Sequence, residues 1–186
     1  MVRHLHRMPD PVAALAPLVI SLTLDDAAQD RFDDLRWRYF PPERLLVGAH
    51  VTMFHALPGD RETCVRQAVA SACAYTPPFS IAVVGLRSLG NGVAYELAAE
   101  PAIALRRRLL ACFCGWLTPQ DRGHWRPHVT VQNKVTPEIA RNTKTLLARL
   151  PFACPVTATG VAVWRYRGGP WEAVARYAFA GPTAEP

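Results

Sequence analysis

The chain has 186 residues, of which 50% are hydrophobic, and its 21 Lys and Arg outnumber its 15 Asp and Glu to give a formal net charge of +6. A charged fraction of 19% without a polar low-complexity tract excludes disorder over most of the chain and indicates one globular domain with a sizeable core. The longest uncharged apolar stretch, residues 11–24, is too short for a membrane-spanning helix, which needs about 20 apolar residues. We therefore expect no membrane association.

Five cysteines at scattered positions form a poor disulfide framework and indicate a reducing, cytoplasmic compartment. Cys112 and Cys114 form an isolated C-x-C without the second ligand pair of a zinc site, so we expect no bound metal. The basic excess consists almost entirely of arginine, whose guanidinium binds phosphate oxygens through paired hydrogen bonds. Codon bias in a GC-rich genome explains the same excess, so the preference for a phosphate-bearing ligand is weak.

The first half of the chain predicts alternating strands and helices. Apolar alternation predicts a strand over 18–24, and Asp25 is placed to cap a helix that reaches Tyr39. A strand over 48–57 and a helix over 61–75 follow, before a pair of prolines. Strands over 79–86 and 93–98 then form a hairpin, because the Asn-Gly pair between them favours a tight turn.

The second half predicts helices over 101–117 and 136–150, with strands over 127–133, 152–157, 161–167 and 171–179. The resulting order, β-α-β-α-β-β-α-β-α-β-β-β, contains no linker. It predicts an α+β fold with mostly antiparallel sheets. We expect a single domain over 17–180, between a flexible N-terminal tail (1–16) and a C-terminal tail (181–186).

The tripeptide His-Val-Thr occurs twice, at 50–52 and at 128–130, with the two copies 78 residues apart. A chain of this composition contains about half an H-x-[ST] motif by chance, so two copies alone carry little weight. Both copies, however, share the central valine, lie inside a predicted strand and follow a short irregular segment. This agreement indicates an internal repeat.

Alternation along a strand places His50 and Thr52 on one face, and His128 and Thr130 repeat the arrangement. An imidazole can transfer a proton, and a neighbouring hydroxyl can bind a phosphate oxygen. If the two strands lie close together, two imidazoles flank one bound group. In-line phosphoryl transfer needs a base and an acid on opposite sides of phosphorus, which two histidines supply without a metal or other cofactor. Ordinary hydrogen-bonded strand histidines are the alternative.

The segments GAHVTMF at 48–54 and RPHVTVQ at 126–132 resemble the paired motifs of the two-histidine (2H) phosphoesterase superfamily, also called the 2'-5' RNA ligase-like or RNA 2',3'-cyclic phosphodiesterase family. The resemblance covers about residues 17–179. It implies a bilobal α+β fold in which two mostly antiparallel sheets flank a central cleft, with helices outside, and chemistry on 2',3'-cyclic phosphates or 2'-5' bonds. It further implies that His50 and His128 are the acid and the base, and that Thr52 and Thr130 bind the phosphate.

Five further residues are candidates for substrate contact. Arg126 and Gln132 share strand parity with His128, so we expect them to face the same way. Either face of the strand over 161–167 can meet the cleft. One face would offer an aromatic side chain to stack on a base, and the other an arginine to bind phosphate. A packed tryptophan and edge arginines are the alternative for that strand. Its candidates are Trp164, Arg165 and Tyr166.

Other polar residues carry weaker signals. His55 lies an odd number of positions after His50, so we expect it on the opposite face of the strand. His124 and Trp125 precede the second motif, either as a surface loop or as part of the cleft lining. The run of arginines at 106–108 most often means a solvated helix face, with nucleic-acid contact as the alternative.

The sequence therefore predicts a metal-independent, cofactor-free hydrolase, acting on a cyclic phosphate or 2'-5' phosphodiester of a nucleotide or RNA end, as a cytoplasmic monomer. Ligation at the same site is an alternative, because water and a 5'-hydroxyl attack through the same transition state. A non-catalytic module that binds RNA or a nucleotide is a second alternative. The paired polar strands disfavour a purely structural partner protein.

Overall fold

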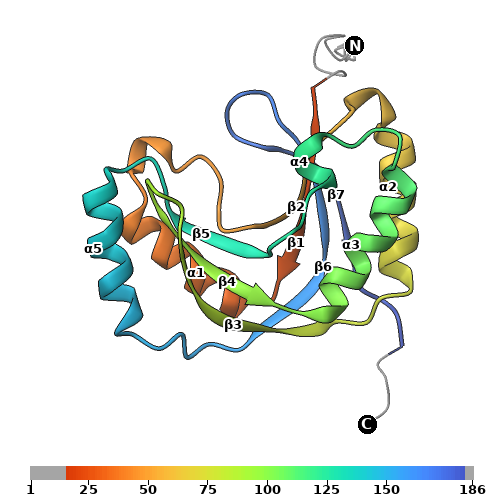
Figure 1. The fold of residues 1–186 in the computed structure, drawn as a ribbon. Coiled ribbons are helices and arrows are strands. Elements are labelled where there is room, and N and C mark those ends of the chain that lie inside the picture. The colour runs from red at the N-terminus through yellow and green to blue at the C-terminus, as the bar shows by residue number, and fades with distance from the viewer. Residues whose placement is uncertain (1–15, 183–186) are drawn as a thin grey trace, which may run out of the picture.

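The computed structural model describes residues 16–182, which contain seven strands and five α-helices (Figure 1). Two short 3-10 helices, η2 (Pro42–Arg44) and η3 (Gly59–Arg61), flank the second strand. The elements are β1 (Leu18–Leu24), α1 (Asp26–Tyr39), β2 (Val51–Leu57), α2 (Glu62–Ala74), β3 (Phe79–Ser88), β4 (Val93–Ala98), α3 (Glu100–Phe113), α4 (Pro119–Arg122), β5 (His128–Gln132), α5 (Pro137–Ala148), β6 (Val156–Arg165) and β7 (Glu172–Ala178).

All strand pairs are antiparallel, and the strands form one continuous seven-stranded sheet whose two parts join where β3 pairs with both β6 and β4. The strand order is β2-β1-β6-β3-β4-β5, with β7 also paired to β6. The first residues of β3, Phe79–Ile81, pair with β6, whereas the residues from Ala82 onward pair with β4. Helices lie on the outer sides of both sheets, and β2 and β5 lie on the inner side (Figure 1). The predicted α+β fold with antiparallel strands and outer helices is confirmed, and the two predicted sheets are continuous through β3.

Two helices cross from one half of the molecule to the other. Helix α1 follows β1 but packs against β5, and its Phe32 meets Tyr95 of β4 with 5.9 Å between ring centroids. Helix α3 follows β4, yet its Phe113 meets Phe54 of β2 with 5.3 Å between ring centroids. Each of these helices therefore supports a strand that belongs to the other sheet.

Helix α1 begins where the sequence predicts, because Asp25 caps it. The Asp25 carboxylate accepts hydrogen bonds from the Ala28 N–H at 3.0 Å and from the Thr157 N–H at 2.6 Å, which ties the helix start to β6. The helix buries one stripe at three- and four-residue spacing. The stripe consists of Ala28, Phe32, Leu35 and Arg36.

The C-terminal strands differ from the prediction. The sequence predicts three strands after residue 151, whereas the structure has two, because β6 runs without a break through Gly160. A Cβ at Gly160 would lie 2.2 Å from the Tyr177 carbonyl oxygen. The glycine therefore allows β7 to approach closely rather than ending a strand, and residues 152–155 form a loop.

Two other element boundaries differ from the prediction by three or more residues. The helix predicted over 101–117 ends at Phe113, and the four residues of α4, capped by the Thr118 hydroxyl, are too few to show a periodic pattern. The strand predicted over 48–57 begins only at Val51. The first motif histidine therefore directly precedes its strand.

The predicted tails fall almost entirely at residues 1–15 and 183–186, outside the described residues. Gly181, the first residue of the predicted C-terminal tail, donates its N–H to the Thr76 carbonyl at 3.0 Å. In the part of the chain that the structure describes, no helix is both long enough and apolar enough to cross a membrane.

The packing of α1 can be tested at Phe32. Its ring is fully buried and stacks on Phe152 with 4.6 Å between centroids. We expect Phe32→Ala to lower the free energy of unfolding by about 3–5 kcal/mol in urea denaturation. Trp37→Ala on the same helix is the control and should change it little, since Trp37 is 77% exposed. A loss below about 1 kcal/mol for Phe32→Ala would contradict this packing.

Candidate active site

The two His-Val-Thr motifs lie on strands at the sheet edges. β2 and β5 stand at the two ends of the strand order, so among the described strands each has a partner along one side only. The two strands contact each other on the inner side of the molecule (Figure 1). Motifs that are 78 residues apart in the sequence are thus neighbours in the fold.

β2 contains a β-bulge directly after its motif. Ser21 and Ile20 of β1 pair with Thr52 and Phe54, which leaves Met53 as the extra residue. Met53 and Phe54 are consecutive and both fully buried, so the alternation of faces shifts by one residue at this point.

The shift changes where His55 points. His55 returns to the exposed face that Thr52 shares, and 40% of its side chain is exposed. The expectation that His55 lies on the face opposite to His50 is therefore wrong, because strand parity holds only where there is no bulge.

β5 repeats this bulge at Val131. Thr130 and Gln132 pair with consecutive residues of β4, and Val131 and Gln132 are both buried. The Gln132 amide donates to the Thr143 hydroxyl of α5 at 2.9 Å. Gln132 thus faces α5 and not the side of His128, because the bulge breaks the parity that the sequence prediction assumed.

Each motif histidine is held by the carbonyl group two residues before it. Nδ1 of His50 lies 2.8 Å from the Gly48 oxygen, and Nδ1 of His128 lies 2.8 Å from the Arg126 oxygen. A carbonyl oxygen can only accept, so Nδ1 is the donor in both rings. Each Nε2 is consequently the nitrogen that can take up or release a proton in the site.

The electrostatic surroundings favour neutral His50. Burial lowers the pKa of His50 to about 4, although the Gly48 carbonyl favours the protonated ring. The charges of Arg36 and His128 lower this pKa further, and that of Asp33 opposes them. The two motif imidazoles are therefore close enough to influence each other, and His50 is neutral at pH 7.

Burial also lowers the pKa of His128, against the effect of its hydrogen bond to a carbonyl. Arg87 and His55 act in the same direction, whereas Glu96 opposes them. Glu96 lies directly opposite His128 in the pairing of β4 with β5. A carboxylate and two basic side chains therefore surround the second motif histidine.

A buried arginine from α1 holds the second motif strand. Arg36 is 4% exposed, and its Nη1 donates to the Thr130 carbonyl at 2.6 Å. Its Nη2 donates to the Val47 carbonyl at 2.8 Å, in the loop before the first motif. Arg36 thus joins the strand of one motif to the approach of the other.

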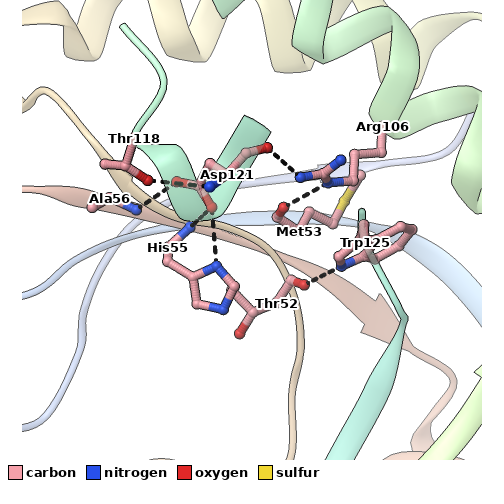
Figure 2. A network of polar contacts seen from close by, with 8 residues as sticks. All are labelled: Thr52, Met53, His55, Ala56, Arg106, Thr118, Asp121 and Trp125. Atoms are coloured by element: carbon pink, nitrogen blue, oxygen red, sulfur yellow. Dashed lines mark hydrogen bonds and ion pairs between the residues drawn. The ribbon is translucent and has the colours of Figure 1, made fainter. Parts of the chain in front are cut away.

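Arg106 of α3 makes the corresponding contacts for the first motif strand and for the segment before the second motif (Figure 2). It is 5% exposed, and its Nε donates to the Met53 carbonyl of β2 at 3.0 Å. Its Nη2 donates to the Asp121 carbonyl at 2.5 Å, in the segment before the second motif. The expected solvated face at 106–108 is therefore wrong for Arg106, while Arg107 and Arg108 are exposed.

Trp125 ties the approach of the second motif to the first motif. Its indole Nε1 donates to the Thr52 carbonyl at 2.8 Å, and its ring lies 5.5 Å from the Arg106 guanidinium carbon (Figure 2). The sequence left open whether His124 and Trp125 form a surface loop or line the cleft, and the contacts of Trp125 do not fit a plain surface loop. His124 is exposed.

The His50 side of the site is aromatic. The Trp171 ring lies 4.5 Å from the His50 ring and 6.1 Å from the Trp164 ring. Trp164 donates its Nε1 to the Ser21 hydroxyl at 2.9 Å, and the Arg176 guanidinium lies 5.4 Å from the Trp164 ring. His50, Trp164 and Arg176 line one cavity of about 300 Å³.

The remaining sequence candidates lie elsewhere. Arg165 forms ion pairs with Glu62 of α2 and, at 3.3 Å, with Glu172, on the side of β6 opposite to Trp164. Tyr166 lies just past the end of β6 and is 44% exposed. Arg126 is exposed at the entrance to β5, where its own carbonyl holds the second motif histidine.

Sequence reasoning missed several residues of this region, among them two buried arginines, an arginine of β3 and a loop tryptophan. Arg36 and Arg106 each lie on the buried stripe of a helix, and a charge at such a position is the signal that could have found them. Arg87 has a buried Nε with no hydrogen-bond partner among the described residues, and no sequence pattern marks it. Trp171 lies in the loop between β6 and β7, where no periodicity applies.

Comparisons with known proteins agree with this architecture. A family model described as the 2'-5' RNA ligase superfamily matches residues 24–170. The structure of TT0787 of Thermus thermophilus aligns with a TM-score of 0.63 at 14% identity, over 90% of this chain and 100% of that chain. E. coli LigT complexed with 3'-AMP aligns with a TM-score of 0.57 at 17% identity, over 89% and 98%. Kluyveromyces marxianus Usb1 with uridine monophosphate aligns with a TM-score of 0.52 at 15% identity, over 88% and 100%.

These structural likenesses concern the fold, because the identities are low. No curated protein matches the sequence. The family match covers most of the chain and both motifs, so the protein belongs to the 2'-5' RNA ligase superfamily. The resemblance drawn from the two motifs is thereby confirmed.

The arginine contacts give a stability prediction. Arg106→Lys cannot make both of its hydrogen bonds, and a buried carbonyl left without a donor costs about 1–3 kcal/mol. We expect a loss of that size in the free energy of unfolding, and the same for Arg36→Lys. The exposed neighbours provide controls, since Arg107→Lys and Arg38→Lys should be close to neutral. Equal stability of Arg106→Lys and Arg107→Lys in urea denaturation would rule out this structural role.

Proposed function

We propose that the protein is a metal-independent phosphoesterase that hydrolyses a 2',3'-cyclic phosphate or a 2'-5' phosphodiester of a nucleotide or RNA end. One observation carries the proposal: each motif strand bears an imidazole whose Nδ1–H is bound to a carbonyl and whose Nε2 is left for proton transfer. Two such groups on neighbouring strands match the base and acid that in-line displacement at phosphorus requires.

Hydrolysis then divides between the two imidazoles. His50 Nε2 takes a proton from water while the water oxygen bonds to phosphorus on the side opposite to the departing ribose oxygen. As the bond from phosphorus to that oxygen breaks, His128 Nε2–H gives its proton to the oxygen. Thr52 and Thr130 donate hydroxyl hydrogen bonds to the non-bridging oxygens, which gain negative charge in the transition state. Exchange with solvent restores both imidazoles.

The assignment of roles follows from the surroundings of the two rings. His50 has a pKa of about 4 and is neutral at pH 7, which suits a base. Burial lowers the pKa of His128 as well, but the Arg126 carbonyl and the Glu96 carboxylate opposite it both favour the protonated ring, so His128 is assigned the acid. The buried guanidinium of Arg36 adds positive charge beneath the site where phosphate would bind.

The cavity beside His50 is proposed to take the nucleoside. Its tryptophan offers a flat face on which a base can stack, and Arg176 at its edge can contact phosphate or base. The structures of E. coli LigT with 3'-AMP and of Usb1 with uridine monophosphate support a nucleotide as the ligand class. Arg126 remains a candidate contact at the opposite entrance, because its side chain is exposed.

Ligation is the second candidate, because the family name itself includes RNA ligases. A 5'-hydroxyl in the place of the attacking water would use the same two imidazoles. A panel of 2',3'-cyclic nucleotides, RNA ends with a cyclic phosphate and a free 5'-hydroxyl, and 2'-5' linked oligonucleotides separates the activities by their products. Turnover should persist in EDTA, and His50→Ala and His128→Ala should each abolish it. Binding of these compounds without turnover would leave only a nucleotide-binding module.

The pH dependence of kcat/KM follows from the directions of the two pKa shifts. Activity should rise with pH as His50 loses its proton near pH 4, and fall as His128 loses its proton at a pKa that lies below the ordinary 6.5. We therefore expect a bell-shaped profile for the free enzyme with its maximum below pH 6.5. A maximum above pH 8, or a flat profile, would contradict catalysis by these two imidazoles.

A further inference from the structure

His55 is a third imidazole on the exposed face of β2. The bulge at Met53 brings it back to the face of Thr52, and Figure 2 shows the second ring nitrogen of His55 turned to the same side as the Thr52 hydroxyl. His55 is one of the groups that lower the pKa of His128, so the His55 ring lies near the second motif. It is not part of either His-Val-Thr motif.

The ring is fixed by a buried carboxylate. His55 Nδ1 lies 3.0 Å from Asp121 Oδ1, and Asp121 is fully buried. The same carboxylate accepts the backbone N–H groups of His55 at 2.9 Å and Ala56 at 3.1 Å, on the free side of the edge strand. Burial alone would raise the pKa of Asp121, but these hydrogen bonds outweigh it and hold the pKa below its ordinary value.

An ionised carboxylate can only accept, so Nδ1 of His55 is the donor and Nε2 faces the site. The orientation is further secured because the Asp121 carbonyl accepts from Arg106 and its N–H donates to the Thr118 hydroxyl (Figure 2). The ring is thus fixed through Nδ1, and its free nitrogen lies on the side of the Thr52 hydroxyl (Figure 2).

We propose that His55 contacts the substrate: its Nε2–H binds a non-bridging oxygen of the reacting phosphoryl group from the side of His128, and Asp121 is the residue that positions the ring. This inference rests on the proposed function of the two motifs. No covalent bond forms or breaks at His55: the ring donates Nδ1–H to the Asp121 carboxylate and Nε2–H to the phosphate oxygen, and neither proton is transferred in the reaction. The groups that face it are Asp121 of α4, Thr52 of β2 and His128 of β5.

The experiment separates the two nitrogens of the ring. His55→Asn keeps an amide N–H in the place of Nδ1, so the bond to Asp121 is preserved while the nitrogen in the site is lost. His55→Gln instead offers an amide nitrogen near the place of Nε2. His124→Asn is the matched control, since His124 is exposed in the loop before the second motif.

We expect His55→Asn to unfold at the same temperature as the unmodified protein while its kcat/KM for a 2',3'-cyclic nucleotide falls about 10²-fold. Its affinity for inorganic phosphate, measured by calorimetry, should fall as well. His55→Gln should recover part of both losses, and His124→Asn should change neither.

Unchanged kcat/KM and phosphate affinity in His55→Asn would overturn the inference. So would a loss of activity that matches a loss of thermal stability and that His55→Gln does not rescue, because the role would then be structural. If the unmodified protein turns over none of the substrates, the proposed function fails. The phosphate-binding comparison still decides whether His55 contacts an anion.

Discussion

The structure depends on hydrogen bonds from two buried guanidinium groups to main-chain carbonyls. The motif strands stand at sheet edges, and the outward carbonyls of an edge strand need donors when they are buried. Arg36 and Arg106 supply these donors from helices that cross between the halves of the molecule. Each guanidinium also lies against an aromatic ring, 4.5 Å from the Phe40 centroid and 5.1 Å from the Phe54 centroid, which offsets part of the cost of burying the charge.

This arrangement links packing to chemistry. Each arginine fixes the backbone of one motif strand and the segment leading to the other motif, so neither strand can shift without straining both. Arginine keeps its proton in proteins, so a positive charge remains under the site whatever the pH. That charge contributes to keeping His50 neutral, which suits the base that we propose, and it favours an anionic ligand. The two arginines thus hold both motif strands, and Arg36 also adds to the effect of burial on the charge of His50.

The sequence predicted those parts of the molecule that follow from hydrophobic periodicity and from capping and turn residues. Apolar alternation located β1 and β4 to the residue, and the cap at Asp25 located the start of α1. Repetition of His-Val-Thr indicated which strands carry the site. Inserted residues in these strands do not alter the hydrophobic pattern enough to be recognised, and the bulges therefore reversed the expected directions of Gln132 and His55. Contacts between distant segments, such as Trp171 with His50, depend on the folded chain alone.

Both imidazoles are proposed to act on one phosphoryl group through Nε2, and a crystal structure of the protein with uridine vanadate, a five-coordinate analogue of the transition state, would show whether they do. We expect vanadium between the two strands, with Nε2 of His50 and Nε2 of His128 each within about 3.2 Å of an oxygen on opposite sides of the metal. Vanadate bound to only one of the two motif strands, or a ring turned so that Nδ1 faces the analogue, would contradict it.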